Sequence, residues 1–131
     1  MIVDSSALLA ILLEEPGFET YAAALSRANP VRVSAANYLE VCIVADGKGD
    51  PRLSRRVDDL INAPGAIIEP VTERQARIAR EAYRDYGKGS GHPARLNFGD
   101  CFAYALARDR AEPLLYKGTD FSHTDIRSAI G

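Results

Sequence analysis

Four acidic residues, Asp4, Glu40, Asp100 and Asp120, stand beside or within apolar stretches rather than among other charges. If they met at one place, their like charges would repel, so the arrangement makes chemical sense chiefly around a divalent cation. A site built only from carboxylate oxygens suits Mg²⁺ or Mn²⁺ better than zinc. Such sites serve phosphodiester hydrolysis, because the ion lowers the pKa of a bound water, orients it and stabilises the departing oxygen. No side-chain nucleophile is then required.

Glu40 is the least expected of the four acids, because the run Tyr38–Ala45 around it is almost wholly apolar. On a helix it would share a face with Ala36, Ile43 and Val44. Burying an unpaired carboxylate costs several kcal/mol, on the order of the stability margin of a small domain, so Glu40 requires a partner. An arginine would satisfy it structurally, and a metal ion would satisfy it functionally.

Asp4 and Asp100 each have a structural explanation beside the catalytic one. Asp4 follows an apolar stretch and precedes two serines. It is therefore either a turn or cap residue, or a side chain presented at the carboxyl end of a strand, where open α/β sheets place their sites. Asp100 could simply favour the dipole of the helix that it begins. Ser6 could hydrogen-bond Asp4 or a scissile phosphate, or cap the next helix.

Short apolar stretches separated by helical patterns predict a parallel sheet. The strands are expected near residues 1–4, 31–34, 66–70 and 113–116, with a short terminal strand as a weaker candidate within 122–130. Strands that alternate with helices form a sheet covered on both faces, with right-handed crossovers, and their carboxyl ends all face one way. We therefore expect a three-layer α/β/α fold with four to five strands, in which the four acids converge on one cleft.

Helical periodicity and capping residues predict the segments between these strands. Helices are expected at 7–13, from 18 to about 28, from 35 to about 45, from 51 to about 62, up to 86 after Thr72, and over 101–107. Ser5 or Ser6 should cap the first helix and Ser34 the third, and Thr72 with Gln75 forms a possible capping box for the fifth. The residues expected to face inward from the fifth helix are Ala76, Ala79, Ala82, Tyr83 and Tyr86.

Composition allows a compact enzyme and leaves its activity open. With 131 residues, 47% of them hydrophobic, residues 1–131 are expected to form a single domain with a real core. The formal charge of −2 argues against a protein that coats nucleic acid, though not against a nuclease with a local basic patch. Neither a leader nor a membrane-spanning run is recognisable, so a cytoplasmic protein without membrane association is expected. Cys42 and Cys101 lie in apolar helical patterns and are expected to be buried free thiols.

The stretch from Gly87 to Leu96 is rich in glycine and basic residues, which predicts a mobile loop. It does not match a P-loop, because no Gly-Lys-Ser/Thr follows at the required spacing and no strand precedes it. The loop could contact phosphates or serve as a plain connection. His92 within it and His123 near the C-terminus are not spaced as metal ligands and are expected at the surface.

The blocks of sequence around the four acids resemble the acidic motifs of PIN-domain ribonucleases, specifically those of VapC-type toxins. These blocks are Ile2–Leu8 with Asp4, Ala36–Val41 with Glu40, Leu96–Ala107 with Asp100, and Leu114–Phe121 with Asp120. Their order, their spacing and the overall length fit, so the resemblance covers the entire chain. The last two blocks carry the most specific part of it.

This resemblance implies a five-stranded parallel α/β/α sheet, Mg²⁺-dependent endoribonuclease activity, a homodimer, and inhibition by a cognate VapB-type antitoxin. Asp4, Asp100 and Asp120 would then ligate the metal directly, with Mn²⁺ as a plausible substitute for Mg²⁺. Glu40 would ligate it or position the attacking water, with Ser6 in a supporting role. An antitoxin segment could fill a groove between the apolar first helix and the helix that contains Phe18 and Tyr21, although core packing explains the same residues.

Three other readings compete with the ribonuclease. A haloacid-dehalogenase-like phosphatase would use Asp4 as a covalent nucleophile, but such enzymes carry Asp-x-Asp, and here Ser6 stands at the second position. A receiver-like switch would need paired acids before its acceptor strand and a late lysine; Lys117 fits the latter, but Glu40 would be unexplained. A catalytically silent PIN binding domain is opposed by the four intact acids.

Overall fold

The computed structural model describes residues 1–131 and contains a four-stranded parallel sheet with the strand order β3-β2-β1-β4. The strands are β1 (Ile2–Val3), β2 (Arg32–Ser34), β3 (Ile67–Glu69) and β4 (Leu114–Leu115). All four lie where the apolar stretches predict them. The expected terminal strand is reduced to a single parallel bridge between Leu114 and Ser128.

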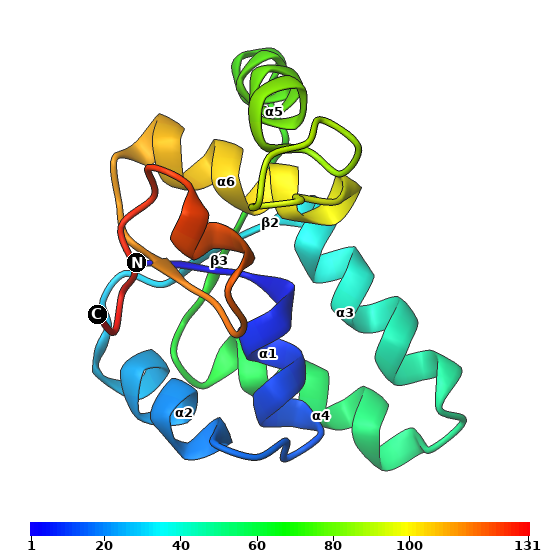
Figure 1. Cartoon of the computed structure of the whole chain (residues 1–131). Helices are drawn as coiled ribbons and strands as arrows, with labels where there is room; N and C mark the ends of the chain where they lie inside the picture. The colour runs from blue at the N-terminus through cyan, green and yellow to red at the C-terminus, as the bar shows by residue number, and fades with distance from the viewer.

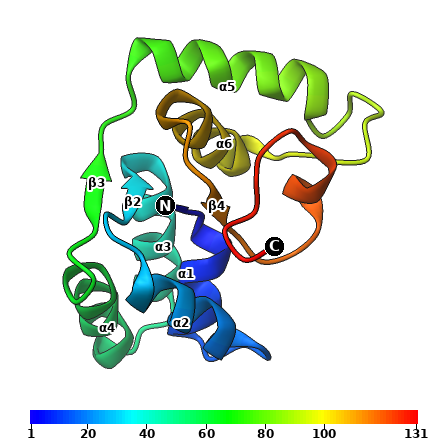
Figure 2. The ribbon, with the colours of Figure 1, turned by 90° about the vertical axis from the view of Figure 1, so that its left-hand side faces the viewer.

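Helices cover both faces of this sheet, which confirms the three-layer α/β/α fold (Figures 1 and 2). The helices are α1 (Ser5–Leu12), α2 (Phe18–Arg27), α3 (Ala35–Gly47), α4 (Pro51–Asn62), α5 (Glu73–Tyr86) and α6 (Phe98–Arg110), followed by a short 3-10 turn, η1 (Asp120–His123). Helices α5 and α6 lie on one face, and α1 to α4 lie on the other. None of these helices is both long and apolar enough to cross a membrane.

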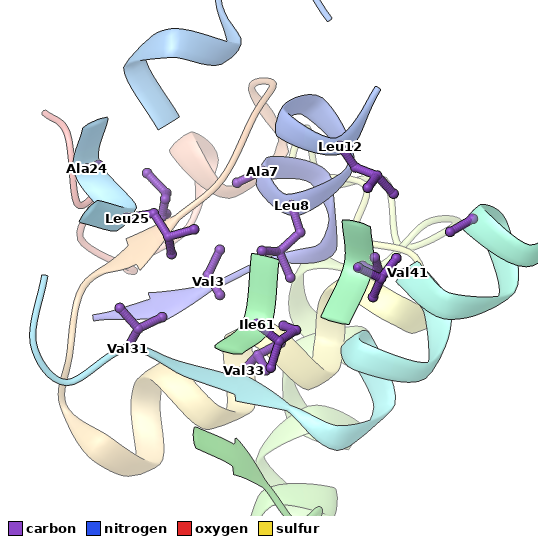
Figure 3. Close-up of a cluster of buried hydrophobic side chains, with 13 residues drawn as sticks. Val3, Ala7, Leu8, Leu12, Ala24, Leu25, Val31, Val33, Val41 and Ile61 are labelled. Atoms are coloured by element: carbon purple, nitrogen blue, oxygen red, sulfur yellow. The ribbon is translucent and has the colours of Figure 1, made fainter. Parts of the chain in front are cut away.

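The alternation of side chains along the strands divides the interior into two cores. Val3 points into the core beneath α1 to α4 (Figure 3). Its register partner Leu115 belongs to the same core. Ile2 and Leu114, the preceding pair, point into the core beneath α5 and α6. All four side chains are at most 1% exposed, so this two-sided burial fixes the register of β1 and with it the position of the residue that follows.

The structure decides two details of the helix starts. Of the candidate caps of α1, Asp4 takes the position rather than Ser5 or Ser6, because β1 ends at Val3 and the Asp4 carboxylate then accepts from the backbone nitrogen of Ser6 at 3.0 Å. The capping box expected at α5 is only half present. The Thr72 hydroxyl accepts from the backbone of Gln75, but the Gln75 side chain donates to Asp109 instead.

Helix α5 buries a narrower face than its periodicity predicts. It packs chiefly against α6 and is the outermost element on its side of the sheet (Figure 2). Ala82 is buried as expected, but Ala76 is exposed and Tyr83 is 46% exposed, so both predictions of inward-facing residues are wrong. A single neighbouring helix covers less of a helix surface than a sheet does.

The segment from Gly87 to Leu96 is tied at its base rather than running as an untethered connection. The backbone nitrogen of Lys88 donates to Leu96, and that of Leu96 donates to Tyr86, at 2.8 and 2.9 Å. The ring of His92 packs edge-on against Tyr86 with 4.9 Å between centroids. Away from the loop, both cysteines are free as expected; Cys101 is buried, and Cys42 is half-buried.

Candidate active site

Asp4 is a buried carboxylate at the junction of β1 and α1. It is 1% exposed, and its Oδ1 atom has no hydrogen-bond donor, while Oδ2 accepts from Ser6. Burial raises the pKa of Asp4 to about 7; Ser6 opposes this through hydrogen bonding, and the charges of Asp100 and Glu40 add to it. A buried carboxylate oxygen without a donor indicates a functional position, because native interiors seldom leave such an atom unpaired.

Glu40 lies in the second turn of α3. Its Oε1 atom accepts a hydrogen bond from the side-chain nitrogen of Asn37 at 3.3 Å. The same nitrogen donates to the backbone oxygen of Gly99 at 3.0 Å. Glu40 therefore faces the first turn of α6, and no arginine pairs with it in the structure.

Asp100 occupies the first turn of α6 and has a structural role there as well. Asn97 and Asp100 form a reciprocal capping box: each side chain accepts from the backbone nitrogen of the other, at 2.9 and 3.0 Å. Partial burial raises the pKa of Asp100, and the charges of Asp120 and Glu40 contribute in the same direction. In this capping box only Oδ2 of the Asp100 carboxylate accepts a hydrogen bond.

Asp120 is exposed and begins the 3-10 turn η1, five residues beyond the end of β4. The loop that carries it is attached to α1, because the hydroxyl of Ser6 accepts from the backbone nitrogen of Lys117 at 3.0 Å. Ser6 thus braces the Asp120 loop against the helix that follows Asp4. The Lys117 ammonium pairs with Glu15 at 2.8 Å, away from the four acids, which removes the one feature that favoured a receiver-like site.

The four acids lie at one end of the sheet, near enough for their charges to interact but not gathered around a common point. Asp4 is affected by the charges of Glu40 and Asp100, and Asp100 by those of Glu40 and Asp120. No group of three or more His, Cys, Asp or Glu side chains is arranged to hold a metal ion. None of the four takes part in an ion pair. The result is a cluster of like charges without a counter-charge from the chain.

Asn37 is a residue of this site that the sequence analysis did not single out. It is 1% exposed, it contacts both Glu40 and the residue before Asp100, and its own Oδ1 atom is buried without a donor. The available signal was an asparagine three positions before an acid on an apolar helix. Its contact with α6 could not be read from that spacing.

Comparison with known proteins identifies the family. Residues 1–127 match the PIN domain. The chain is 58% identical to Ribonuclease VapC28 of Mycobacterium tuberculosis over 130 residues, which cover 99% of this chain and 98% of that protein. It is 52% identical to Ribonuclease VapC42 of the same organism over 129 residues, which cover 98% of each chain.

Solved structures show the same fold at low sequence identity. The crystal structure of Mycobacterium tuberculosis VapC20, described as a toxin that cleaves the sarcin-ricin loop, has a TM-score of 0.75 at 19% identity and covers 95% of both chains. FitAcB from Neisseria gonorrhoeae has a TM-score of 0.70 at 18% identity, over 97% of this chain and 94% of that one. These structures share the fold, and the close relatives share the sequence over nearly the whole chain. This chain therefore belongs to the PIN-domain family, among its VapC ribonucleases.

Proposed function

We propose that this chain is the toxin of a VapBC-type toxin–antitoxin pair, and that it hydrolyses RNA phosphodiester bonds as an Mg²⁺-dependent endoribonuclease through Asp4, Glu40, Asp100 and Asp120. The observation that carries the proposal is the unpaired Oδ1 atom of buried Asp4, next to three acids without a counter-charge. A cation would relieve both the repulsion and the unmet polar atom. All of residues 1–131 would form this one PIN domain, acting on RNA in the cytoplasm.

The donor set fits a hard divalent cation. All four side chains offer carboxylate oxygens, so Mg²⁺ or Mn²⁺ suits them better than zinc. Asp4, Asp100 and Asp120 would hold the ion, and Glu40 would hold it or position the attacking water. When bound, the ion would activate a water and stabilise the departing oxygen of the phosphodiester.

The surrounding residues hold these carboxylates in place for the reaction. Asp4 is fixed by burial and by its cap contact, so its free oxygen keeps one direction. Asp100 is fixed by the reciprocal box with Asn97. Ser6 restrains the loop of Asp120 through the Lys117 backbone. Carboxylates held in place before the reaction need less rearrangement when charge develops in the transition state.

The direct test is cleavage of a mixed cellular RNA pool by purified protein that is free of antitoxin. Cutting should occur with Mg²⁺, should stop with EDTA, and should fall more than about 100-fold in Asp100→Asn, which exceeds the usual loss from an outer-shell change. Asp59→Asn is the matched control, because Asp59 is exposed on α4 and its side chain makes no hydrogen bond. Cutting by Asp100→Asn at the wild-type rate, or undiminished cutting in EDTA, would refute the proposed site.

The proposed partner is a VapB-type antitoxin, docked in an apolar groove between α1, α2 and the end of α4. The groove is lined by Ile11, Ala22, Leu25, Ser26, Leu60, Ala63 and Pro64. The groove therefore involves both helices that the sequence analysis named, while Tyr21 of α2 packs against the buried core. A solved structure titled as a toxin–antitoxin complex from Klebsiella pneumoniae shares the fold, with a TM-score of 0.68 at 18% identity over 92% of this chain and 89% of that one. That protein's partner and the names of the relatives support the same kind of partner here.

A homodimer is also proposed, through an exposed apolar surface on α3, α5 and α6. This surface, which we call the α3–α6 surface, consists of Leu39, Ile43, Tyr83, Phe98 and Phe102. Ile43 is 62% exposed and Phe98 is 78% exposed, which is unusual for large apolar side chains that lie together. Two adjoining grooves share Phe98 and Phe102, so the surface is continuous.

Introducing charge into the α3–α6 surface should therefore turn a dimer into a monomer. We expect the double variant Ile43→Asp/Phe98→Asp to halve the mass measured by light scattering after size-exclusion chromatography at micromolar concentration, because charged groups are not tolerated in the core of an interface. The control is Ile130→Asp, which alters another exposed apolar residue away from this surface. A wild-type protein that is monomeric, or a double variant that remains dimeric, would contradict the prediction.

A further inference from the structure

The amide of Asn37 joins the two helices that carry Glu40 and Asp100. Its nitrogen donates to Oε1 of Glu40 at 3.3 Å and to the backbone oxygen of Gly99 at 3.0 Å, across 62 residues of sequence. Because both partners are acceptors, the amide nitrogen must face them. Its oxygen is then left buried without a donor. Native interiors seldom leave a buried polar atom unpaired, so the unpaired Oδ1 atom of Asn37 indicates that its contact with Glu40 and Gly99 serves the site.

Gly99 makes this contact possible from the side of α6. A Cβ atom at position 99 would lie 2.7 Å from Oε2 of Glu40, closer than real Cβ contacts come, and 3.2 Å from its carboxyl carbon, which is tighter than most real contacts. Gly99 lies inside α6, in the backbone conformation of an ordinary helical residue. The backbone conformation at position 99 does not require glycine. The missing side chain therefore serves to leave space for the Glu40 carboxylate.

Without the Asn37 contact, Glu40 would be pushed away from the other acids. Its charge acts on both Asp4 and Asp100, so the like charges repel it toward solvent, and no cationic side chain pulls it back. A glutamate side chain has enough rotatable bonds to swing out at little cost. The neutral amide of Asn37 is the only side-chain hydrogen-bond partner of Glu40.

Building on the proposed function, we propose that Asn37 and Gly99 are positioning residues of the ribonuclease site. Asn37 holds the Glu40 carboxylate over the bare backbone of Gly99, next to Asp100, and so sets the separation of the two carboxylates. Neither residue touches the reacting atoms; both act through Glu40. By holding Glu40 in place, Asn37 and Gly99 would favour the binding of a divalent cation between the carboxylates of Glu40 on α3 and Asp100 on α6.

The sharpest variant is Gly99→Ala, because it displaces the far end of a flexible side chain and leaves the helix intact. We expect Mn²⁺ binding, measured by electron paramagnetic resonance, to weaken about tenfold to hundredfold, as for the loss of an outer-shell partner. RNA cleavage should need a correspondingly higher Mg²⁺ concentration. The unfolding temperature without metal should not fall, since alanine favours a helix over glycine. Gly47→Ala is the matched control, because Gly47 also lies in a helix and a Cβ there meets nothing within 4 Å.

Asn37→Ala tests the hydrogen bond that holds Glu40 from the side of α3. It should weaken Mn²⁺ binding to a similar extent, although it also lowers stability by emptying a buried position. In the double variant Asn37→Ala/Gly99→Ala the two losses should not add, because both act by releasing Glu40. Additive losses would mean that the two residues act independently, which would overturn their joint role.

The outcomes separate this proposal from the proposed function. If the wild type binds no Mn²⁺, or Asp100→Asn binds it equally well, the metal site itself is wrong. If the wild type requires Mg²⁺ and Asp100 while Gly99→Ala keeps wild-type Mn²⁺ affinity, only the positioning role is overturned. A Gly99→Ala protein that loses Mn²⁺ affinity together with thermal stability would also overturn it, since general damage to α6 would then explain the loss.

Discussion

Replacing Asp4 by asparagine is expected to abolish RNA cleavage and, in the absence of metal, to stabilise the protein at pH 8. The activity loss should exceed about 100-fold, because a charged oxygen donor is removed from the proposed metal site. The stability gain follows from burial, which raises the pKa of Asp4 to about 7 against an ordinary value of 3.8. Keeping this group ionised at pH 8 therefore costs the folded state on the order of 4 kcal/mol. Asparagine carries no such charge.

The amide of Asp4→Asn would keep the cap hydrogen bond. Its oxygen can accept from the Ser6 nitrogen as the carboxylate does. Thermal unfolding in EDTA should show a rise of about 5 °C or more, and added Mg²⁺ should raise the wild type but leave the variant unchanged. A variant that cuts RNA normally, or that unfolds at a lower temperature than the wild type, would show that Asp4 is a structural cap and no more.

The metal-free protein should lose stability as the pH rises through the window from about 4 to about 7. Asp4 has a pKa near 3.8 when unfolded and about 7 when folded, so the folded state holds more protons throughout that window. The stabilising contribution is complete below the lower value and is lost above the upper one. Asp100 adds to the trend, because its pKa is raised as well. Burial opposes the shift, but the chain's amino terminus and Arg32 lower the pKa of Glu112 from its ordinary value of 4.5, so its opposite contribution is confined to pH values below about 4.5, at the acid end of this window.

Urea unfolding at pH 5, 6, 7 and 8 in EDTA measures this trend. The midpoint for the wild type should fall with pH, and that for Asp4→Asn should fall much less. Mg²⁺ should offset the loss above pH 7, because it binds the ionised carboxylates. A wild-type midpoint that rises between pH 5 and 7, or that follows the same course as Asp4→Asn, would contradict the raised pKa.

Much of the fold was predictable because it depends on local patterns. The four strands lie where apolar residues are bounded by polar ones, and the caps Ser34 and Thr72 hold the helix starts that their positions indicate. The cap of α1 stayed open in the sequence, because Asp4, Ser5 and Ser6 can all cap a helix. Only the pairing of β1 with its neighbours in the sheet decides that the strand ends at Val3 and that Asp4 takes the position.

The family and the four acids could likewise be named from the sequence, because each acid stands within a motif of fixed order and spacing. The family is confirmed, and the assignment of the four acids to a metal site stays a prediction. The residue types, the elements that carry them and the end of the sheet that they share can therefore be inferred from local patterns and motif order. Which polar atoms are unpaired, the exposure of Tyr83 and the contact of Asn37 with Gly99 cannot, because these depend on contacts between segments that no local pattern places side by side.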